Sequence, residues 1–382
     1  MVCMRKEEGC MEHVKGLVDS TLREGAQTVG VSLDIDQKVA LAGLLGLLGI
    51  EELEVGIAGA EGVELAELVR RCRGEAGVER LSLWCRCRTD DIESAVRLKP
   101  EVLSLSIPVS DLHIASKLRC RREDVAGLVS SSLRSARREI PYLSLGLEDA
   151  TRADKEFLFQ IIRVACETGV DRIRLADTVG IATPAGISDL VRKVRSAFSV
   201  EVGVHMHNDF GMASANAIAA LEAGAHWADV TVLGLGERAG NSRLEEVAGF
   251  LSLRAGRPYN PAIFKDLALF ASRCSGREIA PQHPVVGRNI FLCETGLHLL
   301  GLSCDPVTYE PYEPSLVGGR RKLIYGEKIG RRGVAERLRQ LGVQCQESQL
   351  GEFASAFRRH CRRLGRPLCD QEVLQLVAEH SA

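Results

Sequence analysis

The sequence predicts an α/β fold, a TIM (β/α)8 barrel followed by a small linker segment and a C-terminal helical region. Three observations support this prediction. Eight short apolar runs alternate with helix-like stretches. Several of these stretches end in glycine directly before the next run, as helices often do. Polar residues follow nearly every run, which is where such barrels place their chemistry.

The expected strands are short and recur along the chain, at 16–19, 53–57, 81–85, 102–107, 142–147, 172–176, 202–205 and 228–233. Helical patterns lie between them, for example at 34–50, 90–98, 153–170 and 214–225. A doubly wound open sheet is the alternative. That fold usually carries a glycine-rich turn after its first strand, and DSTLREG at 19–25 is not such a turn. The barrel is therefore the preferred prediction.

The chain changes character after the expected barrel. Residues 1–257 are expected to form the catalytic barrel, and 258–330 form a post-barrel segment rich in proline, glycine and tyrosine. Residues 331–382 have a helical and basic pattern, with the runs RRGVAERLRQLG and FASAFRRHCRRLG. Neither run is interleaved with aromatic residues in the way typical of nucleic-acid sites, so solvated helix faces are preferred.

Composition narrows the class of protein. The 382 residues carry a net charge of -2, which gives no global reason to expect a nucleic acid or an anionic membrane as partner. No apolar run reaches the roughly 18 residues of a membrane span, and the polar N-terminus lacks the apolar core of a signal peptide. The 13 scattered cysteines are typical of reduced thiols. These features predict a cytoplasmic protein.

The segment VHMHNDFG at 204–211 predicts a metal site. In a strand, residues i and i+2 point the same way, so His205 and His207 would face one ion at the mouth of the barrel. Glu24, after the first strand, is the expected carboxylate ligand. The alternative is that the histidines only satisfy hydrogen bonds in the core. Asn241, in the loop GLGERAGN, is a further candidate ligand, and Arg23 would stabilise negative charge on a carbonyl oxygen.

Four motifs carry a resemblance to a known family, namely DSTLREG at 19–25, LADTVGIATP at 175–184, HMHNDFGMASANAIAALEAGA at 205–225 and GLGERAGN at 234–241. Together they resemble the DRE-TIM metallolyases, and more narrowly the homocitrate, 2-isopropylmalate and citramalate synthases. The resemblance covers roughly residues 14 to 330. It implies a divalent metal (Mg, Mn or Zn), acetyl-CoA as a substrate, and a Claisen-type condensation with a 2-oxo acid.

The resemblance also implies roles for individual residues. Glu24, His205 and His207 match the metal ligands, with Asn241 as a weaker one. Arg23, Glu148, His298 and Tyr309 match catalytic residues, with His298 as the base. Residues expected to bind the 2-oxo acid are Arg23, Gln27, Glu54, Arg86, Arg88, His113 and Thr178. In the family the post-barrel segment reaches over a partner subunit, which implies a homodimer.

The identity of the 2-oxo acid is left open. Only about 50 residues follow the post-barrel segment, so a further regulatory domain of the leucine-pathway type is not expected. The segments WCR at 84–86, PVSDLH at 108–113 and GLEDATRAD at 146–154 resemble homocitrate synthases of the nitrogenase-cofactor type. A dicarboxylate such as 2-oxoglutarate needs a cation for its distal carboxylate, and Arg86, Arg88 and His113 are the expected groups. Re-type citrate synthase uses oxaloacetate, which is also a dicarboxylate, and would need the same positively charged groups. 2-Isopropylmalate and citramalate synthases are further alternatives.

Two other functions compete with a synthase. A carbon–carbon lyase of the same superfamily would carry a cysteine in the loop after the eighth strand, and GLGERAGN has none. A non-catalytic regulator would be expected to lose Arg23, His298 or Tyr309. Three departures from the family pattern stand out, namely Ala26, Gly146 and the segment GEKIG at 326–330, where the family usually has GKHSG.

Overall fold

The computed structural model describes residues 11–59, 62–294 and 296–381. The chain forms two compact units. The first extends to Ile279 and includes Pro284–Val286, and the second comprises Ala280–His283 and the chain from Gly287 onward. Within the described part, no helix combines the length and the apolar character that a membrane crossing requires.

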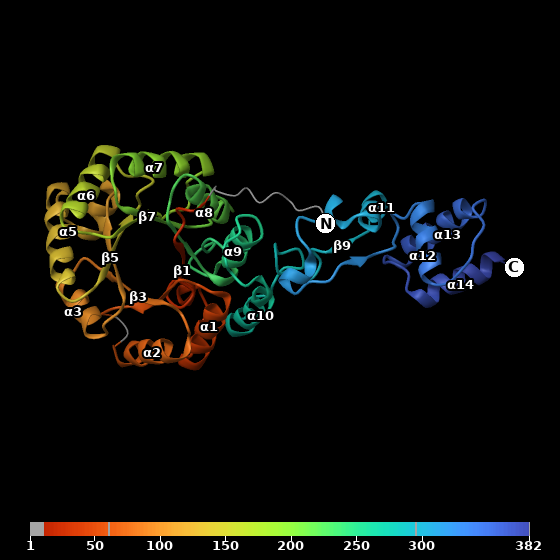
Figure 1. The fold of residues 1–382 in the computed structure, drawn as a ribbon, viewed down its shortest axis with the longest axis horizontal. Coiled ribbons are helices and arrows are strands. Elements are labelled where there is room, and N and C mark those ends of the chain that lie inside the picture. Colours follow the sequence, from red (N-terminus) through yellow and green to blue (C-terminus); the bar gives the residue numbers. More distant parts are fainter. Residues whose placement is uncertain (1–10, 60–61, 295, 382) are drawn as a thin grey trace. The chain divides into compact units, whose positions relative to one another are not determined.

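The first unit is a closed barrel of eight parallel strands in the order β1 to β8, ringed by helices (Figure 1). Each strand pairs with the next, and β8 closes onto β1, where Gly16 lies opposite Trp227. The strands are β1 (Gly16–Asp19), β2 (Glu52–Ile57), β3 (Arg80–Arg86), β4 (Val102–Pro108), β5 (Tyr142–Glu148), β6 (Arg172–Asp177), β7 (Glu201–Met206) and β8 (Trp227–Val230).

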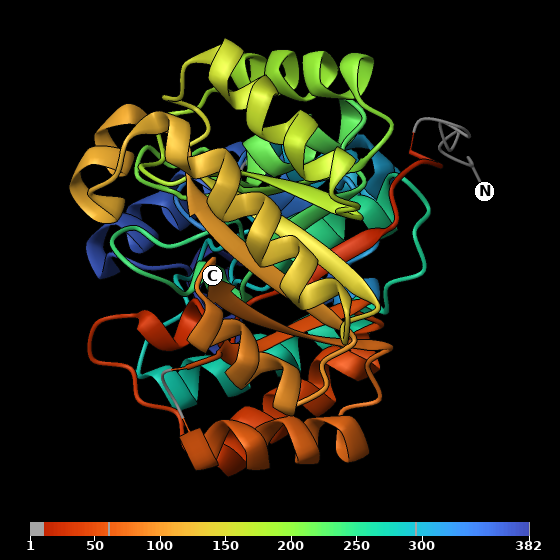
Figure 2. The same ribbon diagram turned by 90° about the vertical axis from the view of Figure 1, so that its left-hand side faces the viewer.

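A helix follows each strand and covers the outside of the barrel (Figure 2). The covering helices are α1 (Ile35–Leu48), α2 (Gly62–Glu75), α3 (Thr89–Arg97), α5 (Arg122–Arg137), α6 (Lys155–Glu167), α7 (Pro184–Ala197), α8 (Ala213–Glu222) and α9 (Leu244–Leu253). A short α4 (Asp111–His113) and a π-helical turn (Ile114–Leu118) precede α5, and α10 (Phe264–Ser275) follows α9.

Local sequence signals fix where the helices begin and end. Asp34 caps α1 by accepting a hydrogen bond from the backbone N–H of Gln37, whose side chain caps Asp34 in return. The helix ends at Gly49, which has φ +94°, a conformation that costs glycine little. Thr183 caps α7, and Pro184 occupies its first turn, where a missing N–H costs no hydrogen bond.

The two faces of the barrel strands differ in polarity. In β5, Leu143, Leu145 and Leu147 are completely buried and alternate with Ser144, Gly146 and Glu148. Successive side chains of a strand point to opposite faces. The leucines therefore pack toward the helices, while the serine, glycine and glutamate face the interior. The interior thus carries polar and charged side chains in place of the branched aliphatic residues common in such barrels.

Charged side chains in the interior are paired across the barrel. Arg172 of β6 donates two hydrogen bonds to Glu52 of β2, at 2.7 and 3.0 Å, and a third to Ser144 at 3.1 Å. Strands β2 and β6 are four positions apart in the ring of eight, so this pair spans the interior. Pairing of this kind is needed because an uncompensated buried charge is strongly destabilising.

The predicted TIM barrel is confirmed, with a correction at the eighth strand. That strand was expected at 228–233, but β8 ends at Val230 and a 3-10 turn (Val232–Gly234) follows. The chain turns there because Leu233 adopts φ +57° and the Thr231 N–H binds the carbonyl of Ser242. This turn brings the loop containing Asn241 back toward His207, with which Asn241 forms a β-bridge.

The second unit is mainly helical, as the sequence predicts for its C-terminal part. Its elements include α11 (Gly296–Cys304), α12 (Arg331–Gln340), α13 (Leu350–Leu364) and α14 (Asp370–Ser381). Two short parallel strands, β9 (Leu292–Cys293) and β10 (Lys322–Leu323), pair with each other. Residues from the four helices and from the connecting segments form a separate hydrophobic core, with Val334, Phe357 and Val373 wholly buried.

Candidate metal centre and active site

Glu24, His205 and His207 lie together at the C-terminal mouth of the barrel. Each offers one ligand atom, and these atoms all lie within 4.8 Å of one another. The Nε2 atoms of the two histidines are 3.3 Å apart, and Oε1 of Glu24 lies 3.5 Å from Nε2 of His205. All three residues are buried. The structure therefore assembles the three side chains that the sequence singled out.

The chemistry of this cluster fits a divalent cation. Two imidazole nitrogens and one carboxylate oxygen form a donor set that suits Zn²⁺, Mn²⁺ and related ions. Burial, reinforced by His205, lowers the pKa of His207 to about 3, so this imidazole is neutral and keeps a lone pair. Oδ1 of Asn241 is buried and has no hydrogen-bond partner among the described residues, as expected for a fourth donor.

Asp229 of β8 orients the His205 ring. Its Oδ2 lies 2.9 Å from Nδ1 of His205. A carboxylate at this nitrogen holds the proton there and leaves the Nε2 lone pair directed at Glu24 and His207. The same Oδ2 accepts a hydrogen bond from Arg174 at 2.9 Å. Asp229 is therefore placed to orient a proposed metal ligand, His205, through the ring nitrogen that faces away from His207.

We expect Asp229→Asn to weaken metal binding by about 10- to 100-fold, the usual effect of losing a partner behind a ligating histidine. The asparagine keeps the shape of the side chain but removes the charge that favours the Nδ1–H tautomer of His205. Titration of the protein with Mn²⁺ against a chelator measures the change. Asp189→Asn, which removes an exposed ion pair with Lys193 on α7, is the control. Equal affinity in folded Asp229→Asn protein would contradict the assignment.

Arg23 is held beside the cluster by carboxylates. Its guanidinium pairs with Glu24 and donates from Nε to Glu54 at 2.7 Å, and it lies 5.6 Å from the centre of the Trp84 ring. Burial alone would raise the pKa of Glu54, but Arg23 and Arg174 outweigh it and hold the pKa below its usual range. Glu54 was expected to bind substrate. In the structure both of its oxygens accept hydrogen bonds from Ser20, Arg23 and Arg174, which suits a role in holding the two arginines in place.

Glu148, His113 and Thr178 gather at the ends of β4, β5 and β6. Glu148 accepts a hydrogen bond from Ser106 at 3.0 Å and pairs with Lys117. Nδ1 of His113 lies 4.0 Å from Glu148. The Thr178 hydroxyl accepts a hydrogen bond from the backbone N–H of Asp149 at 2.8 Å. These three residues, predicted from the sequence, therefore share one side of the mouth.

The remaining expected substrate residues are more exposed. Arg86 is bound by Asp91 through two hydrogen bonds, at 2.6 and 3.0 Å, and its side chain is 56% exposed. Arg88 precedes α3 and is exposed, and Gln27 is exposed in the turn after β1. Because Asp91 already neutralises Arg86, that arginine is a weaker candidate for a substrate carboxylate than the sequence suggested.

Two interior residues of the site, Arg174 and Asp229, were not predicted from the sequence. Arg174 donates from Nη1 to Glu54 at 3.0 Å and to Asp229 at 2.9 Å, so it links β6 to β2 and β8. Burial alone would lower its pKa, but Asp229 and Glu54 raise it, so Arg174 stays charged. A signal was present in RIRLAD at 172–177, where arginines alternate with apolar residues in a strand predicted to be buried.

His298 and Tyr309 lie in the second unit and contact each other. His298 is exposed on α11, and Tyr309, 44% exposed, follows a short turn (Pro306–Thr308). Their ring centres are 4.2 Å apart. The structure therefore pairs the two residues that the resemblance gives to the base and its tyrosine.

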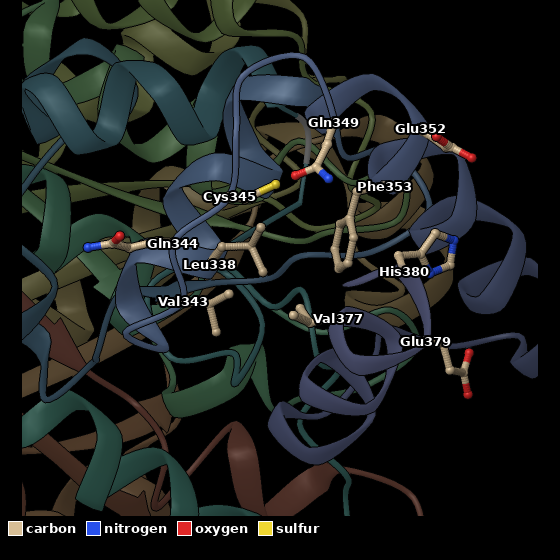
Figure 3. A pocket seen from close by; sticks show the side chains of 10 residues that line it. All are labelled: Leu338, Val343, Gln344, Cys345, Gln349, Glu352, Phe353, Val377, Glu379 and His380. Atoms are coloured by element: carbon tan, nitrogen blue, oxygen red, sulfur yellow. The ribbon is translucent and has the colours of Figure 1, made fainter. Parts of the chain in front are cut away.

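Other features of the second unit concern its own core. Ile329, in the GEKIG segment, is buried in that core, which gives the segment a packing role. A cavity of about 280 Å³ lies among α12, α13 and α14 (Figure 3). Phe353 and His380 lie in the wall of this cavity and contact each other edge to face, with their ring centres 5.9 Å apart. None of the site residues predicted from the sequence lines this cavity.

Comparison with known proteins matches both units. Residues 15–265 match the HMGL-like family, and residues 285–364 match the family described as homocitrate synthase post-HMGL domain-like. The chain is 35% identical to 2-isopropylmalate synthase 2 of Caldanaerobacter subterraneus subsp. tengcongensis, over 95% of each chain. It is 36% identical to homocitrate synthase 1 of Nostoc sp., over 94% of this chain and 96% of that protein.

Among solved structures, the hydroxymethylglutaryl-CoA lyase of Pseudomonas aeruginosa aligns with a TM-score of 0.62 at 20% identity, over 70% of this chain and 95% of that chain. This likeness concerns the fold. The sequence matches cover both units and reach 35% identity along nearly the whole length. The chain is an enzyme that belongs to the HMGL-like family and carries the post-HMGL domain of the homocitrate synthase type.

Proposed function

We propose that the protein catalyses a metal-dependent condensation of acetyl-CoA with a 2-oxo acid. The triad of Glu24, His205 and His207 at the barrel mouth is the observation that carries this proposal. Relatives named as homocitrate, 2-isopropylmalate and citramalate synthases support it. Bound at the triad, a divalent ion would supply Lewis acidity to the keto group of the 2-oxo acid. The identity of the ion (Mg, Mn or Zn) is part of the proposal.

The residues of the chain then have distinct tasks. His298, with Tyr309 and Glu148, removes a proton from the acetyl methyl group. The resulting carbon nucleophile forms a bond with the keto carbon, whose oxygen becomes negative. Arg23, which Glu54 holds beside the triad, would stabilise that negative charge. The oxygen then takes up a proton, and water cleaves the thioester to release CoA and the hydroxy acid.

We propose 2-oxoglutarate as the 2-oxo acid and homocitrate as the product. Relatives named homocitrate synthase in Frankia alni and Nostoc sp., at 39% and 36% identity, support this choice. Oxaloacetate, 2-oxoisovalerate and pyruvate are the competing acceptors. A carbon–carbon lyase is disfavoured because the GLGERAGN loop carries no cysteine.

We further propose that the enzyme is a cytoplasmic homodimer whose second unit serves the barrel of its partner. In this proposal residues 1–257 form the catalytic barrel with the metal site. Residues 258–330 form the post-barrel segment, which supplies His298 and Tyr309, and residues 331–382 form the C-terminal helical region. The match of residues 285–364 to a post-HMGL domain supports a dedicated role for this region. The 13 cysteines scattered along the sequence are typical of reduced thiols, which supports a reducing compartment.

Release of free CoA from acetyl-CoA, measured with Mg²⁺ or Mn²⁺ and four acceptors in parallel, tests the activity. We expect 2-oxoglutarate to give a kcat/KM at least about 100-fold above that of pyruvate. Pyruvate lacks the distal carboxylate, so the groups that bind this carboxylate would be left without a partner. Preference for oxaloacetate would keep the chemistry and change the product to citrate. No turnover of any acceptor by folded, metal-loaded protein would overturn the proposal.

A further inference from the structure

The guanidinium of Arg174 has unused donors inside the barrel. Only 4% of Arg174 is exposed. Its Nη1 donates to Glu54 and to Asp229, at 3.0 and 2.9 Å. In the part of the chain that the structure describes, no group accepts a hydrogen bond from its Nε or Nη2. A buried guanidinium normally has its donors satisfied, so this edge of the side chain is suited to a ligand.

The free edge of Arg174 lies over a residue without a side chain. Gly146 of β5 is paired in register with Arg174 on one side and with Ser106 of β4 on the other. A Cβ atom at Gly146 would lie 3.6 Å from Nε of Arg174 and 3.6 Å from Oγ of Ser106. Glycine thus keeps open the space in which the guanidinium and the hydroxyl approach each other.

A second unpaired donor points into the same interior. Ser104, two residues before Ser106 on β4, has the same side-chain direction, because alternate residues of a strand share a face. Its hydroxyl oxygen is buried and has no hydrogen-bond partner among the described residues. A buried hydroxyl without a hydrogen-bond partner is costly, and the unused N–H groups of Arg174 can bind an anion, so the two side chains together suit an acceptor such as a carboxylate.

This donor set adjoins the proposed metal centre. Oδ2 of Asp229 accepts a hydrogen bond from Arg174 and contacts Nδ1 of His205, each at 2.9 Å. One carboxylate therefore separates the guanidinium from a metal ligand. The guanidiniums of Arg23 and Arg174 face three carboxylates, Glu24, Glu54 and Asp229. The net charge of these five groups is negative, and a divalent ion at the triad would make it positive. A positive site favours an acceptor that carries two negative charges.

We infer that Arg174 and Ser104, around the open position at Gly146, bind the distal carboxylate of a dicarboxylic 2-oxo acid. The inference rests on the proposed function and deepens it, because it assigns acceptor specificity to named residues. It replaces Arg86 and Arg88 in this role. Arg86 is already bound by Asp91, and both side chains are exposed, whereas Arg174 is buried with two N–H groups free for a planar, bidentate contact.

Two substitutions test the inference. Arg174→Lys keeps a positive charge for Glu54 and Asp229 but removes the planar pair of donors. Gly146→Val fills the open position with a side chain that suits a strand. We expect each to lower kcat/KM for 2-oxoglutarate about 10- to 100-fold more than kcat/KM for pyruvate, which is the effect of losing a hydrogen bond to a charged group. Manganese affinity is measured for each variant to show that the metal site is intact.

The outcomes separate this inference from the proposed function. An equal loss for pyruvate and 2-oxoglutarate in both variants would overturn the inference, because Arg174 would then act only through Glu54 and Asp229. A wild-type preference for pyruvate or 2-oxoisovalerate would also overturn it, while the condensation would stand. If the wild type turns over no acceptor, the proposed function fails. Calorimetric binding of 2-oxoglutarate to manganese-loaded protein then decides the inference. Weaker binding in both variants supports it, and unchanged binding overturns it.

Discussion

His207→Ala is expected to lower kcat for CoA release at least about 1000-fold, because Lewis-acid stabilisation is worth several kcal/mol and each 1.36 kcal/mol is a factor of ten. His207 contributes one of three clustered ligand atoms, and the remaining pair, Glu24 and His205, would hold an ion more weakly. Metal analysis of the purified variant should show a matching loss of bound Mn²⁺ or Zn²⁺.

The control for this variant is His360→Ala. That residue is a half-buried histidine on α13 whose Nδ1 contacts the carbonyl of Ala356. The His360→Ala substitution removes an imidazole from the second unit and changes neither the triad nor the His298–Tyr309 pair. The metal content and turnover of this variant should therefore match those of the wild type. Full turnover by His207→Ala with unchanged metal content would place the ion elsewhere.

Co-expression of His207→Ala with His298→Ala is expected to restore about a quarter of the wild-type activity, although each variant alone is inactive. The reason is the proposed sharing of sites between subunits. In a mixed dimer, one site combines both substitutions and the other combines an intact barrel with an intact second unit. Random pairing makes half of the dimers mixed, and half of their sites work. Turnover per chain of the unfractionated co-expressed mixture measures the recovery, and mixed dimers isolated through two different tags should reach about half of the wild-type activity.

This experiment has a direct control. Co-expression of His207→Ala with Glu24→Ala places both substitutions in the barrel, so no combination of subunits yields an intact metal centre and no activity should return. Recovery in the first pair but not in the second would support shared sites. Absence of recovery in mixed dimers verified by mass would mean that each chain completes its own site.

The sequence predicted the barrel well because the strand signals are local. Short apolar runs mark the strands, and the first seven expected runs fall within one residue of the observed strands, as at 142–147 against Tyr142–Glu148. The eighth strand was predicted too long. Its last residues are apolar like those of a strand, but the positive φ of Leu233 and the closing contacts to Ser242 and Arg243 depend on a distant loop.

The site residues that belong to sequence motifs could be predicted. The site residues that meet only because the barrel closes could not. HMHND and DSTLREG named Glu24, His205 and His207 from spacing and resemblance. Arg174 is meaningful only because β6 faces β2 across the ring and lies near β8, which brings it to Glu54 and Asp229. Arg86 looked available in the sequence because its partner Asp91 lies in the following helix, where sequence alone does not reveal the pairing.

The dependence of turnover on metal in the wild-type protein tests the role of the Glu24, His205 and His207 triad most directly. The protein is stripped with a chelator and then titrated with Mn²⁺ while CoA release from acetyl-CoA and 2-oxoglutarate is followed. We expect no turnover without metal and a rise in turnover that saturates when one ion is bound per chain. The same titration of His207→Ala should give no rise. Equal turnover in metal-free and metal-loaded protein would show that Glu24, His205 and His207 do not bind a catalytic ion.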